Sequence, residues 1–230
     1  MPLSDDLHSE VTSIFKTSWE RREGRLVPEP ESVTLGNDAV ELDATVLYAD
    51  LAESTQLVDT KKALFAAEIY KSYLICASRV IKSEGGTITA FDGDRVMGVF
   101  IGDNKNSSAA RSALKINYAV RKIINPALKA QYPSDDYEVR QAVGVDTSKL
   151  LVARTGIRGS NDLVWVGRAA NYAAKLCSLR DGVFASWITE SVFSALHDTV
   201  KHTNGQAMWE QRTWTSRNMT VYRSSWTWSP

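Results

Sequence analysis

The sequence predicts an α+β fold of the ferredoxin-like, split βαβ type, with helices flanking an antiparallel-rich central sheet. Two observations support this fold: an apolar run at residues 46–55 that ends in acidic and hydroxyl residues, and paired apolar runs at 86–100 around Asp92-Gly93. A helical pattern follows each of them, which gives the order strand, helix, hairpin, helix, strand. A length of 230 residues suits one domain, with or without appendages, and allows a sizeable core.

Residues 1–40 are expected to form an N-terminal helix and an extended connector, outside a main domain at 41–230. Ser4 is a suitable N-cap, and apolar residues recur at helical spacing to residue 22. Such an amphipathic appendage would pack on its own domain or on a second subunit, with a membrane surface as the lesser alternative. Prolines and a glycine mark residues 24–37 as the connector.

Residues 41–51 form the first predicted strand, in which period-two alternation places Val46, Tyr48 and Asp50 on one face. Asp59 or Thr60 then caps a long helix that runs to residue 83. Its predicted buried stripe recurs at helical spacing and consists of Phe65, Ile69, Tyr73, Cys76 and Val80.

The next predicted element is a hairpin with strands at 87–92 and 94–101. Asp92-Gly93 suits a two-residue type I′ turn, and Asp94 opens the returning strand. If the first strand lies beside this hairpin, Asp50 and Asp94 meet at one end of the sheet. Hard divalent cations such as Mg²⁺ bind a few such oxygen ligands and share their coordination with substrate phosphates.

A second long helix is expected at about residues 107–127. Its predicted inward face consists of Ala109, Ala113, Ile116, Val120 and Ile123. Strands follow at 137–145 and 150–155. Residues 163–166 then lead into a helix that carries Asn171 and Lys175 four residues apart, on one face.

The last fifty residues would extend the sheet, with segments at 182–187, 208–214 and 220–226 and a short helix at 189–197. Tryptophans crowd the C-terminal end. Because aromatic residues are enriched both in cores and at interfaces, these tryptophans either cap the core or form a dimer contact.

Composition excludes several classes of protein. The 27 basic and 27 acidic residues balance, so no basic field indicates a nucleic-acid partner. The N-terminus lacks the pattern of a signal peptide and no apolar segment is long enough to span a bilayer, which predicts a cytoplasmic protein without a membrane partner. Cys76 and Cys177 have no C-x-x-C spacing and are expected to be buried thiols.

Three motifs, in this order, resemble the signature of class III nucleotidyl cyclases: Y-x-D at 48–50, G-D at 93–94 and G-x-x-x-N-x-x-x-K at 167–175. The usual signature ends in arginine where this chain has Lys175. Each motif alone is weak, and their order and spacing give the resemblance its weight. It covers roughly residues 41–225, implies the same ferredoxin-like core, and assigns 41–230 as a nucleotidyl cyclase catalytic domain.

The resemblance implies a two-metal site. Asp50, Asp94 and the backbone carbonyl of Leu51 would hold two Mg²⁺ or Mn²⁺ ions per site, as in two-metal displacement at phosphorus. One ion would activate the ribose 3′-hydroxyl for attack on the α-phosphate, and the other would stabilise the pyrophosphate leaving group. Asn171 would orient the ribose. Lys175 would stabilise the pentavalent phosphate with the charge of arginine but without its bidentate geometry.

Phosphate contacts are expected where the first strand ends. Backbone N–H groups of residues 51–55, with Ser54 and Thr55 among them, would cradle the triphosphate at a helix start. The family often has glycine where this chain has Glu53, whose carboxylate is unfavourable there unless it points outward. Arg212 or Arg217 would replace the family's lysine at the distal phosphates, unless each is a solvated surface residue.

The base-reading positions depart most from the family. Adenylate cyclases have hydrogen-bonding side chains where this chain has Ala90 and Val164, which have none. The site is therefore inactive, promiscuous, or built for another base. A pyrimidine is smaller than a purine, and Tyr48 or Arg95 would fill the remaining space. Alternatively, Tyr48 packs under the sheet and Arg95 pairs with Asp92.

A single-domain cyclase with substituted purine positions is similar to the bacterial pyrimidine cyclases of the Pycsar anti-phage system. That resemblance implies a lyase that converts UTP, in preference to CTP, to the 3′,5′-cyclic monophosphate, a second messenger for a separate effector protein. It also implies a homodimer, with Asp50 and Asp94 from one chain and Asn171 and Lys175 from the other. The alternatives are an adenylate cyclase with an unusual base pocket and a catalytically silent cyclase-like domain.

Overall fold

The computed structural model describes residues 2–230. The strands are β1 (Glu20–Glu23), β2 (Asp38–Leu51), β3 (Thr87–Asp92), β4 (Arg95–Phe100), β5 (Gln141–Ile157), β6 (Ser160–Val166), β7 (Ser186–Thr189), β8 (His202–Thr203), β9 (Gln206–Ala207), β10 (Glu210–Trp214) and β11 (Met219–Ser224). The α-helices are α1 (Leu3–Lys16), α2 (Ser54–Thr60), α3 (Ala63–Ser83), α4 (Lys105–Tyr118), α5 (Asn125–Gln131), α6 (Arg168–Leu176), α7 (Glu190–Ser194) and α8 (Asp198–Lys201).

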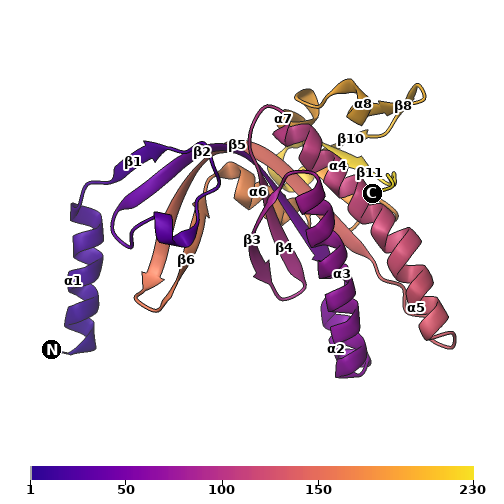
Figure 1. Cartoon of the computed structure of the whole chain (residues 1–230), viewed down its shortest axis with the longest axis horizontal. Coiled ribbons are helices and arrows are strands. Elements are labelled where there is room, and N and C mark those ends of the chain that lie inside the picture. The colour runs from indigo at the N-terminus through magenta and orange to yellow at the C-terminus, as the bar shows by residue number, and fades with distance from the viewer. Residues whose placement is uncertain (1) are drawn as a thin grey trace.

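The main sheet has the order β10-β11-β7-β5-β2-β4-β3, and β8 and β9 form a small separate hairpin (Figure 1). The neighbours along this order are antiparallel except for β5 and β7. The predicted antiparallel-rich α+β fold is therefore confirmed.

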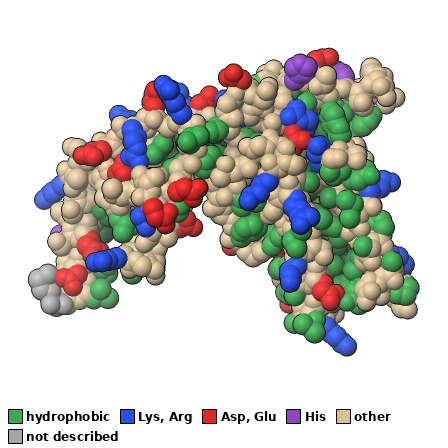
Figure 2. Space-filling model, viewed as in Figure 1, with side chains coloured by type: hydrophobic (Ala, Val, Ile, Leu, Met, Phe, Trp, Pro, Cys, Tyr) green, Lys and Arg blue, Asp and Glu red, His purple; other side chains and the backbone are tan. Residues whose placement is uncertain are grey.

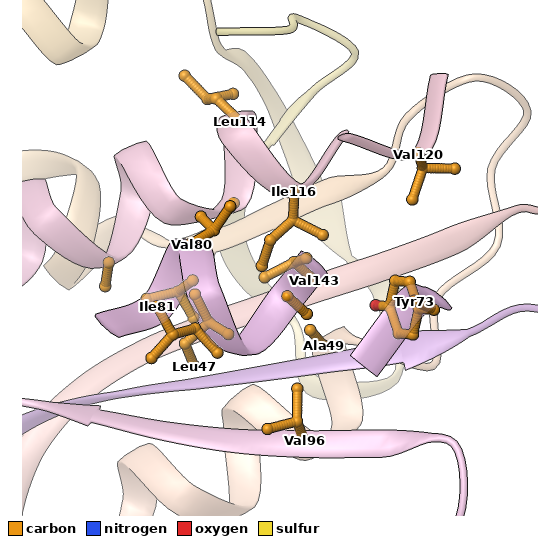
Figure 3. Close-up of a cluster of buried hydrophobic side chains, with 14 of the residues drawn as sticks. Leu47, Ala49, Tyr73, Val80, Ile81, Val96, Leu114, Ile116, Val120 and Val143 are labelled. Carbon is orange, nitrogen blue, oxygen red and sulfur yellow. The ribbon is translucent and has the colours of Figure 1, made fainter. Parts of the chain in front are cut away.

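The two faces of β2 pack against different helices, as its period-two alternation requires. Leu47, Ala49 and Leu51 face a core completed by α3 and α4, part of which Figure 3 shows. Val46 and Tyr48 lie on the opposite face, in a second cluster that includes the alanines of α6. Asp50 follows on that second face. The alternation thus places this carboxylate on the side of the sheet that carries α6.

The two central strands extend beyond the part of the sheet that the helices cover. β2 has 14 residues and β5 has 17, and the two pair from Ala39 and Ala153 to Leu51 and Gln141. Beyond the helices, β1 pairs with β2 and β6 pairs with β5, which gives an arm at one end of the molecule (Figure 1). The sequence predicted two strands in place of β5. They are one, because the polar residues between them stay in the backbone ladder.

The N-terminal helix differs from the prediction in length and in packing. α1 ends at Lys16, and residues 20–23, expected in part to be helical, form β1 beside β2. None of the α1 residues is buried. The helix is held where the side-chain amide of Asn37 donates hydrogen bonds to the carbonyls of Ile14 and Thr17. The C-terminal half of the helix therefore only borders its own domain, at a pocket lined by residues 35–37 and 156–158.

The predicted helix at 59–83 is two helices, and neither Asp59 nor Thr60 caps the longer one, which begins after Lys62. Its stripe is buried as expected except at Cys76, which is half-buried. Cys177 is buried, and burial raises its pKa to about 12. The expectation of two buried thiols thus holds fully only for Cys177.

The predicted helix at 107–127 contains a π-helical segment, Ala119–Ile124, between α4 and α5. A π turn adds a residue to the helical repeat, so it shifts the phase of the buried face. Ile124 is consequently buried while Ile123, predicted to point inward, is 48% exposed. The other predicted inward residues of this helix are buried.

The C-terminal tryptophans pack against the core. Trp209 and Trp214 are buried, and the Trp209 indole donates a hydrogen bond of 2.8 Å to the Val200 carbonyl. Trp226 and Trp228 pack, half-buried, against the cluster formed with α3 and α4. Of the two roles predicted for them, this structure shows core capping. No helix within residues 2–230 is long and apolar enough to cross a membrane.

Candidate functional site

Asp50 and Asp94 lie together at one end of the sheet. Asp50 is the cross-strand partner of Arg95, the first residue of β4, and Asp94 directly precedes Arg95. The hairpin turn consists of Gly93 and Asp94, one residue later than predicted. Gly93 has a φ of +60° and Asp94 a negative φ, which is the pattern of a type II′ turn and not of the predicted type I′. Asp94 is thus a turn residue.

The electrostatics of this pair favour a bound cation. Burial, and then repulsion by Asp94, raise the pKa of the Asp50 carboxyl, whose side chain is 20% exposed. One carboxylate oxygen of Asp94, Oδ2, is buried and has no hydrogen-bond partner in the described chain. Two carboxylates in one place, one of them with an unsatisfied buried oxygen, form a site that a positive charge would stabilise.

Arg180 provides one such charge. Its Nη2 donates hydrogen bonds to Oδ2 of Asp50 at 3.2 Å and to the carbonyl oxygen of Leu51 at 3.3 Å. This guanidinium therefore bridges two of the three groups predicted to bind metal. The sequence analysis did not identify Arg180, because it lies 130 residues from Asp50 in the chain and belongs to no motif.

The residues present fit Mg²⁺ or Mn²⁺ better than a metal that needs an all-protein cage. No cluster of three or more His, Cys, Asp or Glu side chains suited to a metal occurs within residues 2–230. Asp50, Asp94 and the Leu51 carbonyl offer only oxygen ligands. Mg²⁺ is usually held by one or two carboxylates together with substrate phosphates, whereas structural zinc requires four protein ligands.

Tyr48 and Arg95 lie beside the carboxylates on the same face of the sheet. The Arg95 guanidinium stacks 5.2 Å from the centre of the Tyr48 ring and donates a 2.6 Å hydrogen bond to Asp92. Tyr48 and Ala90 are both half-buried against the cluster that contains α6. The structural alternative is thus observed, because Tyr48 is packed and Arg95 is ion-paired with Asp92. Both residues also border the carboxylates.

The turn after β2 places Glu53 in the left-handed conformation, with a φ of 59°. This backbone favours glycine and costs a residue with a side chain about 1 kcal/mol. The Glu53 carboxylate points to Arg140, with which it forms an ion pair. The Ala52 N–H donates to the Arg140 carbonyl, so any cradle of backbone N–H groups is confined to residues after Ala52, near Ser54 and Thr55.

Asn171 and Lys175 lie on the exposed face of α6, opposite the alanines that pack on the sheet. The Asn171 amide donates a 3.2 Å hydrogen bond to the Gly167 carbonyl. Within the described chain, no hydrogen bond or ion pair joins either residue to Asp50 or Asp94. One chain therefore presents the two halves of the predicted site separately.

A glycine in β5 allows α6 to lie this close to the sheet. A Cβ atom on Gly144 would lie 2.2 Å from the Ala173 carbonyl oxygen and 2.5 Å from the Cys177 nitrogen. Only glycine permits that approach. The signal was present in the sequence, because an isolated glycine within a strand often marks a close backbone contact.

An ion pair between Arg168 and the buried Asp146 carboxylate fixes the start of α6. Asp146 is fully buried and accepts hydrogen bonds from Nε of Arg168 at 3.1 Å and from the Thr189 hydroxyl at 2.6 Å. Burial raises the pKa of the Asp146 carboxyl, and the hydrogen bonds of Thr189 and Arg168 oppose that rise. This network ties α6 to β5 and β7, and so holds Asn171 and Lys175 in place.

The remaining predicted residues lie elsewhere. Val164 is on the arm strand β6, separated from Ala90 in β3 by β5, β2 and β4. Arg212 pairs with Glu210, and Arg217 stacks 5.3 Å from the ring of Tyr172 in α6. Neither arginine contacts Asp50 or Asp94 in the described chain.

Comparison with known proteins gives close relatives over the whole chain. A protein from Xanthomonas perforans named uridylate cyclase is 53% identical over 230 residues, 99% of both chains. Proteins with the same name from Burkholderia cepacia and a Rhodovulum species are 52% and 44% identical, and the alignments cover at least 97% of each chain. No protein-family model matches the chain.

Solved structures share the fold at low identity. A bacterial light-regulated adenylyl cyclase superposes with a TM-score of 0.68 at 20% identity, over 84% of this chain and 53% of that one. The guanylyl cyclase Cya2 gives 0.68 at 18% identity over 83% and 95% of the two chains. The adenylyl cyclase CyaB from P. aeruginosa gives 0.62 at 23% identity, over 81% and 95%. The fold is therefore that of nucleotidyl cyclase domains.

Proposed function

This chain belongs to the uridylate cyclase family, and from that premise we propose that it converts UTP to 3′,5′-cyclic UMP and pyrophosphate. Three relatives of that name, at least 44% identical over nearly full length, support the choice of UTP over CTP. The structural observation that carries the proposal is the placement of Asp50 and Asp94 at one end of the sheet. The reaction is an attack of the ribose 3′-hydroxyl on the α-phosphate.

In this proposal Asp50, Asp94 and the Leu51 carbonyl hold two Mg²⁺ or Mn²⁺ ions. When bound, such ions lower the pKa of a coordinated hydroxyl and neutralise phosphate charge. The chain's own contribution is to hold the triphosphate near the start of α2, where backbone N–H groups around Ser54 and Thr55 have no intrahelical partner. The outward-pointing Glu53 carboxylate, paired with Arg140, leaves that turn open to phosphate.

Asn171 and Lys175 complete the site from a second chain, so the active unit is a homodimer. Asn171 orients the ribose, and the Lys175 ammonium stabilises the negative charge that develops on the α-phosphate oxygens. Their exposure on α6, without a hydrogen bond or ion pair to Asp50 or Asp94 in the described chain, supports this assignment. Symmetric pairing of two chains would create two equivalent sites.

Tyr48, Arg95, Ala90 and Val164 are assigned to the base. The stacked Tyr48 and Arg95 side chains occupy space beside the carboxylates, which favours the smaller pyrimidine ring. Ala90 and Val164 offer no hydrogen bonds to a purine. A separate effector protein that responds to cyclic UMP, in defence against phage, is the part of the proposal that rests on resemblance alone.

The test is incubation of the purified chain with Mn²⁺ and each ribonucleoside triphosphate separately, with products identified by mass spectrometry. Cyclic UMP as the main product supports the proposal. Cyclic CMP would keep the mechanism and change the base, and cyclic AMP would show that other residues read adenine. No product from any triphosphate, with a folded dimer present, would overturn the assignment.

A further inference from the structure

α1 carries an apolar stripe that its own chain leaves at least half exposed. Leu7, Val11 and Ile14 are each at least 50% exposed and recur at helical spacing, so they share one face. Asp6 and Glu10 lie four residues apart and border that stripe along one edge. They form no ion pair within residues 2–230. An exposed stripe of this kind marks a docking surface.

A groove with complementary character runs between α3 and the edge strand β3. It has a volume of about 730 Å³. The residues that line it are basic or mostly apolar, with no acidic side chain among them: Lys71, Leu74, Ile75, Ser78, Arg79, Lys82, Ile88 and Phe91. Ile75 and Phe91 are 52% and 59% exposed. The groove thus has a hydrophobic floor that solvent reaches.

The basic residues line one wall of this groove. Lys71, Arg79 and Lys82 fall on one face of α3 by helical periodicity, and none forms an ion pair within residues 2–230. The opposite wall, from β3, is apolar. Figure 2 shows basic side chains among hydrophobic ones over the region where α3 lies. An apolar helix with acids along one edge matches both walls.

The two surfaces lie far apart in one molecule. α1 lies at one end of the long axis, beside the arm, and α3 lies in the opposite half (Figure 1). Their lengths agree: 14 residues of α1 span about 21 Å, and the α3 wall from Lys71 to Lys82 spans about 17 Å. Phe91 faces α3, on the side of the sheet opposite Tyr48, so an occupant of the groove would leave the proposed nucleotide face open.

We propose that α1 of one chain docks in the α3–β3 groove of a second copy, with its apolar stripe on the groove floor and Asp6 and Glu10 against the basic wall. The contact is reciprocal, so a two-fold dimer contains it twice. It belongs to the homodimer of the proposed function and rests on that part of it. It also gives β3, the edge strand whose hairpin bears Asp94, a cover on its helical side.

Charge reversal with rescue tests the pairing. Asp6→Lys with Glu10→Lys should raise the dimer dissociation constant at least about 10-fold, and Arg79→Glu with Lys82→Glu should do the same, because like charges would face each other. The two pairs combined in one chain should restore much of the affinity. Lys122→Glu, on the π-helical segment, is the matched control and should have little effect. Unchanged dimerisation in both pairs, or no rescue on combination, would overturn the proposal.

Crosslinking locates the contact independently of dimer affinity. In a Cys76→Ala background, a tagged chain with Val11→Cys is mixed with an untagged chain with Ser78→Cys and treated with a short bismaleimide. The expected product is a crosslinked heterodimer, and Val183→Cys in place of Ser78→Cys should give little. No crosslinked heterodimer would overturn the proposal. A chain that carries both Val11→Cys and Ser78→Cys would also overturn it if the reagent joined the two cysteines within one chain. This readout uses no nucleotide, so it is unaffected if UTP proves not to be the substrate.

Discussion

The guanidinium of Arg180 bridges the Asp50 carboxylate and the Leu51 carbonyl oxygen, at 3.2 Å and 3.3 Å from its Nη2 atom. It thus lies between two of the groups that we assign to metal binding. Its positive charge favours the ionised form of Asp50, whereas burial and Asp94 disfavour it. Arg180 therefore acts as a counter-ion for the Asp50 carboxylate.

Arg180→Ala should make metal-free protein less stable and metal binding tighter. Without this guanidinium, Asp50 loses its hydrogen-bonded counter-ion, so an added cation should stabilise the two carboxylates more strongly. The melting temperature in EDTA should fall, Mn²⁺ should raise it by more than in the parent, and the Mn²⁺ dissociation constant measured by calorimetry without nucleotide should fall several-fold. Arg180→Lys keeps the charge and serves as the control. Equal Mn²⁺ affinity in parent and Arg180→Ala would contradict this role.

Asp50→Asn should remove activity yet stabilise the metal-free protein at neutral pH. Because the folded-state pKa of Asp50 is raised above its ordinary value of 3.8, the folded state favours the protonated form, and the charge costs stability at higher pH. The gain in melting temperature should be largest at neutral pH and vanish as the pH falls to about 4. Cyclase activity should fall at least ~100-fold with loss of a metal ligand. A lower melting temperature at neutral pH would count against this reading.

Mixing two inactive variants should restore activity if the site lies between chains. Asp50→Ala and Lys175→Ala each inactivate both sites of their own homodimer. In a mixed dimer one site combines the intact Asp50 of one chain with the intact Lys175 of the other. Half of the dimers are mixed at equilibrium and each has one working site, so about a quarter of the parent activity should return. No recovery after subunit exchange, shown by native mass spectrometry, would place the whole site in one chain.

Gly144→Ala should displace α6 and lower activity more than it lowers substrate binding. The added methyl would meet the backbone of α6 at 2.2 Å, which leaves no room without a shift of the helix. Since α6 carries Asn171 and Lys175, kcat should fall by one to two orders of magnitude, as small misplacements of positioning groups cost about 10²-fold. Ala142→Gly, two residues earlier in β5, is a control for strand effects. Parent-like kcat in Gly144→Ala would show that the contact does not position the helix.

Arg95→Ala should relax the choice of base. Removal of the guanidinium opens the space beside Tyr48, where it stacks at 5.2 Å. Small changes in the size of a binding pocket alter discrimination between substrates about 10- to 200-fold. The ratio of kcat/KM for UTP to that for ATP should decrease by a factor in that range. The Tyr48→Phe variant should retain the parent ratio if the Tyr48 ring, and not its hydroxyl, contacts the base. An unchanged ratio in Arg95→Ala would remove this residue from base selection.

The sequence by itself determined the elements whose cause is local. Alternation in β2 placed Tyr48 and Asp50 on one face, and helical spacing identified the buried stripe of α3. Gly93 indicated a tight hairpin, which brings Asp94 to the end of the sheet. These outcomes follow from the repeat of a strand or helix and from the short reach of a two-residue turn. Each needs only neighbouring residues.

The tertiary structure decided what depends on distant residues or on small backbone shifts. Arg180 meets Asp50 across 130 residues, which no local pattern reveals. A π turn moved burial from Ile123 to Ile124, and the turn at Gly93 began one residue late, because each depends on how neighbouring elements pack. The sequence predicts that α1 has an apolar stripe, and the structure shows that this stripe is exposed, because none of the residues of α1 is buried. Local periodicity specifies which face of an element is apolar, and only the packed chain shows what that face meets.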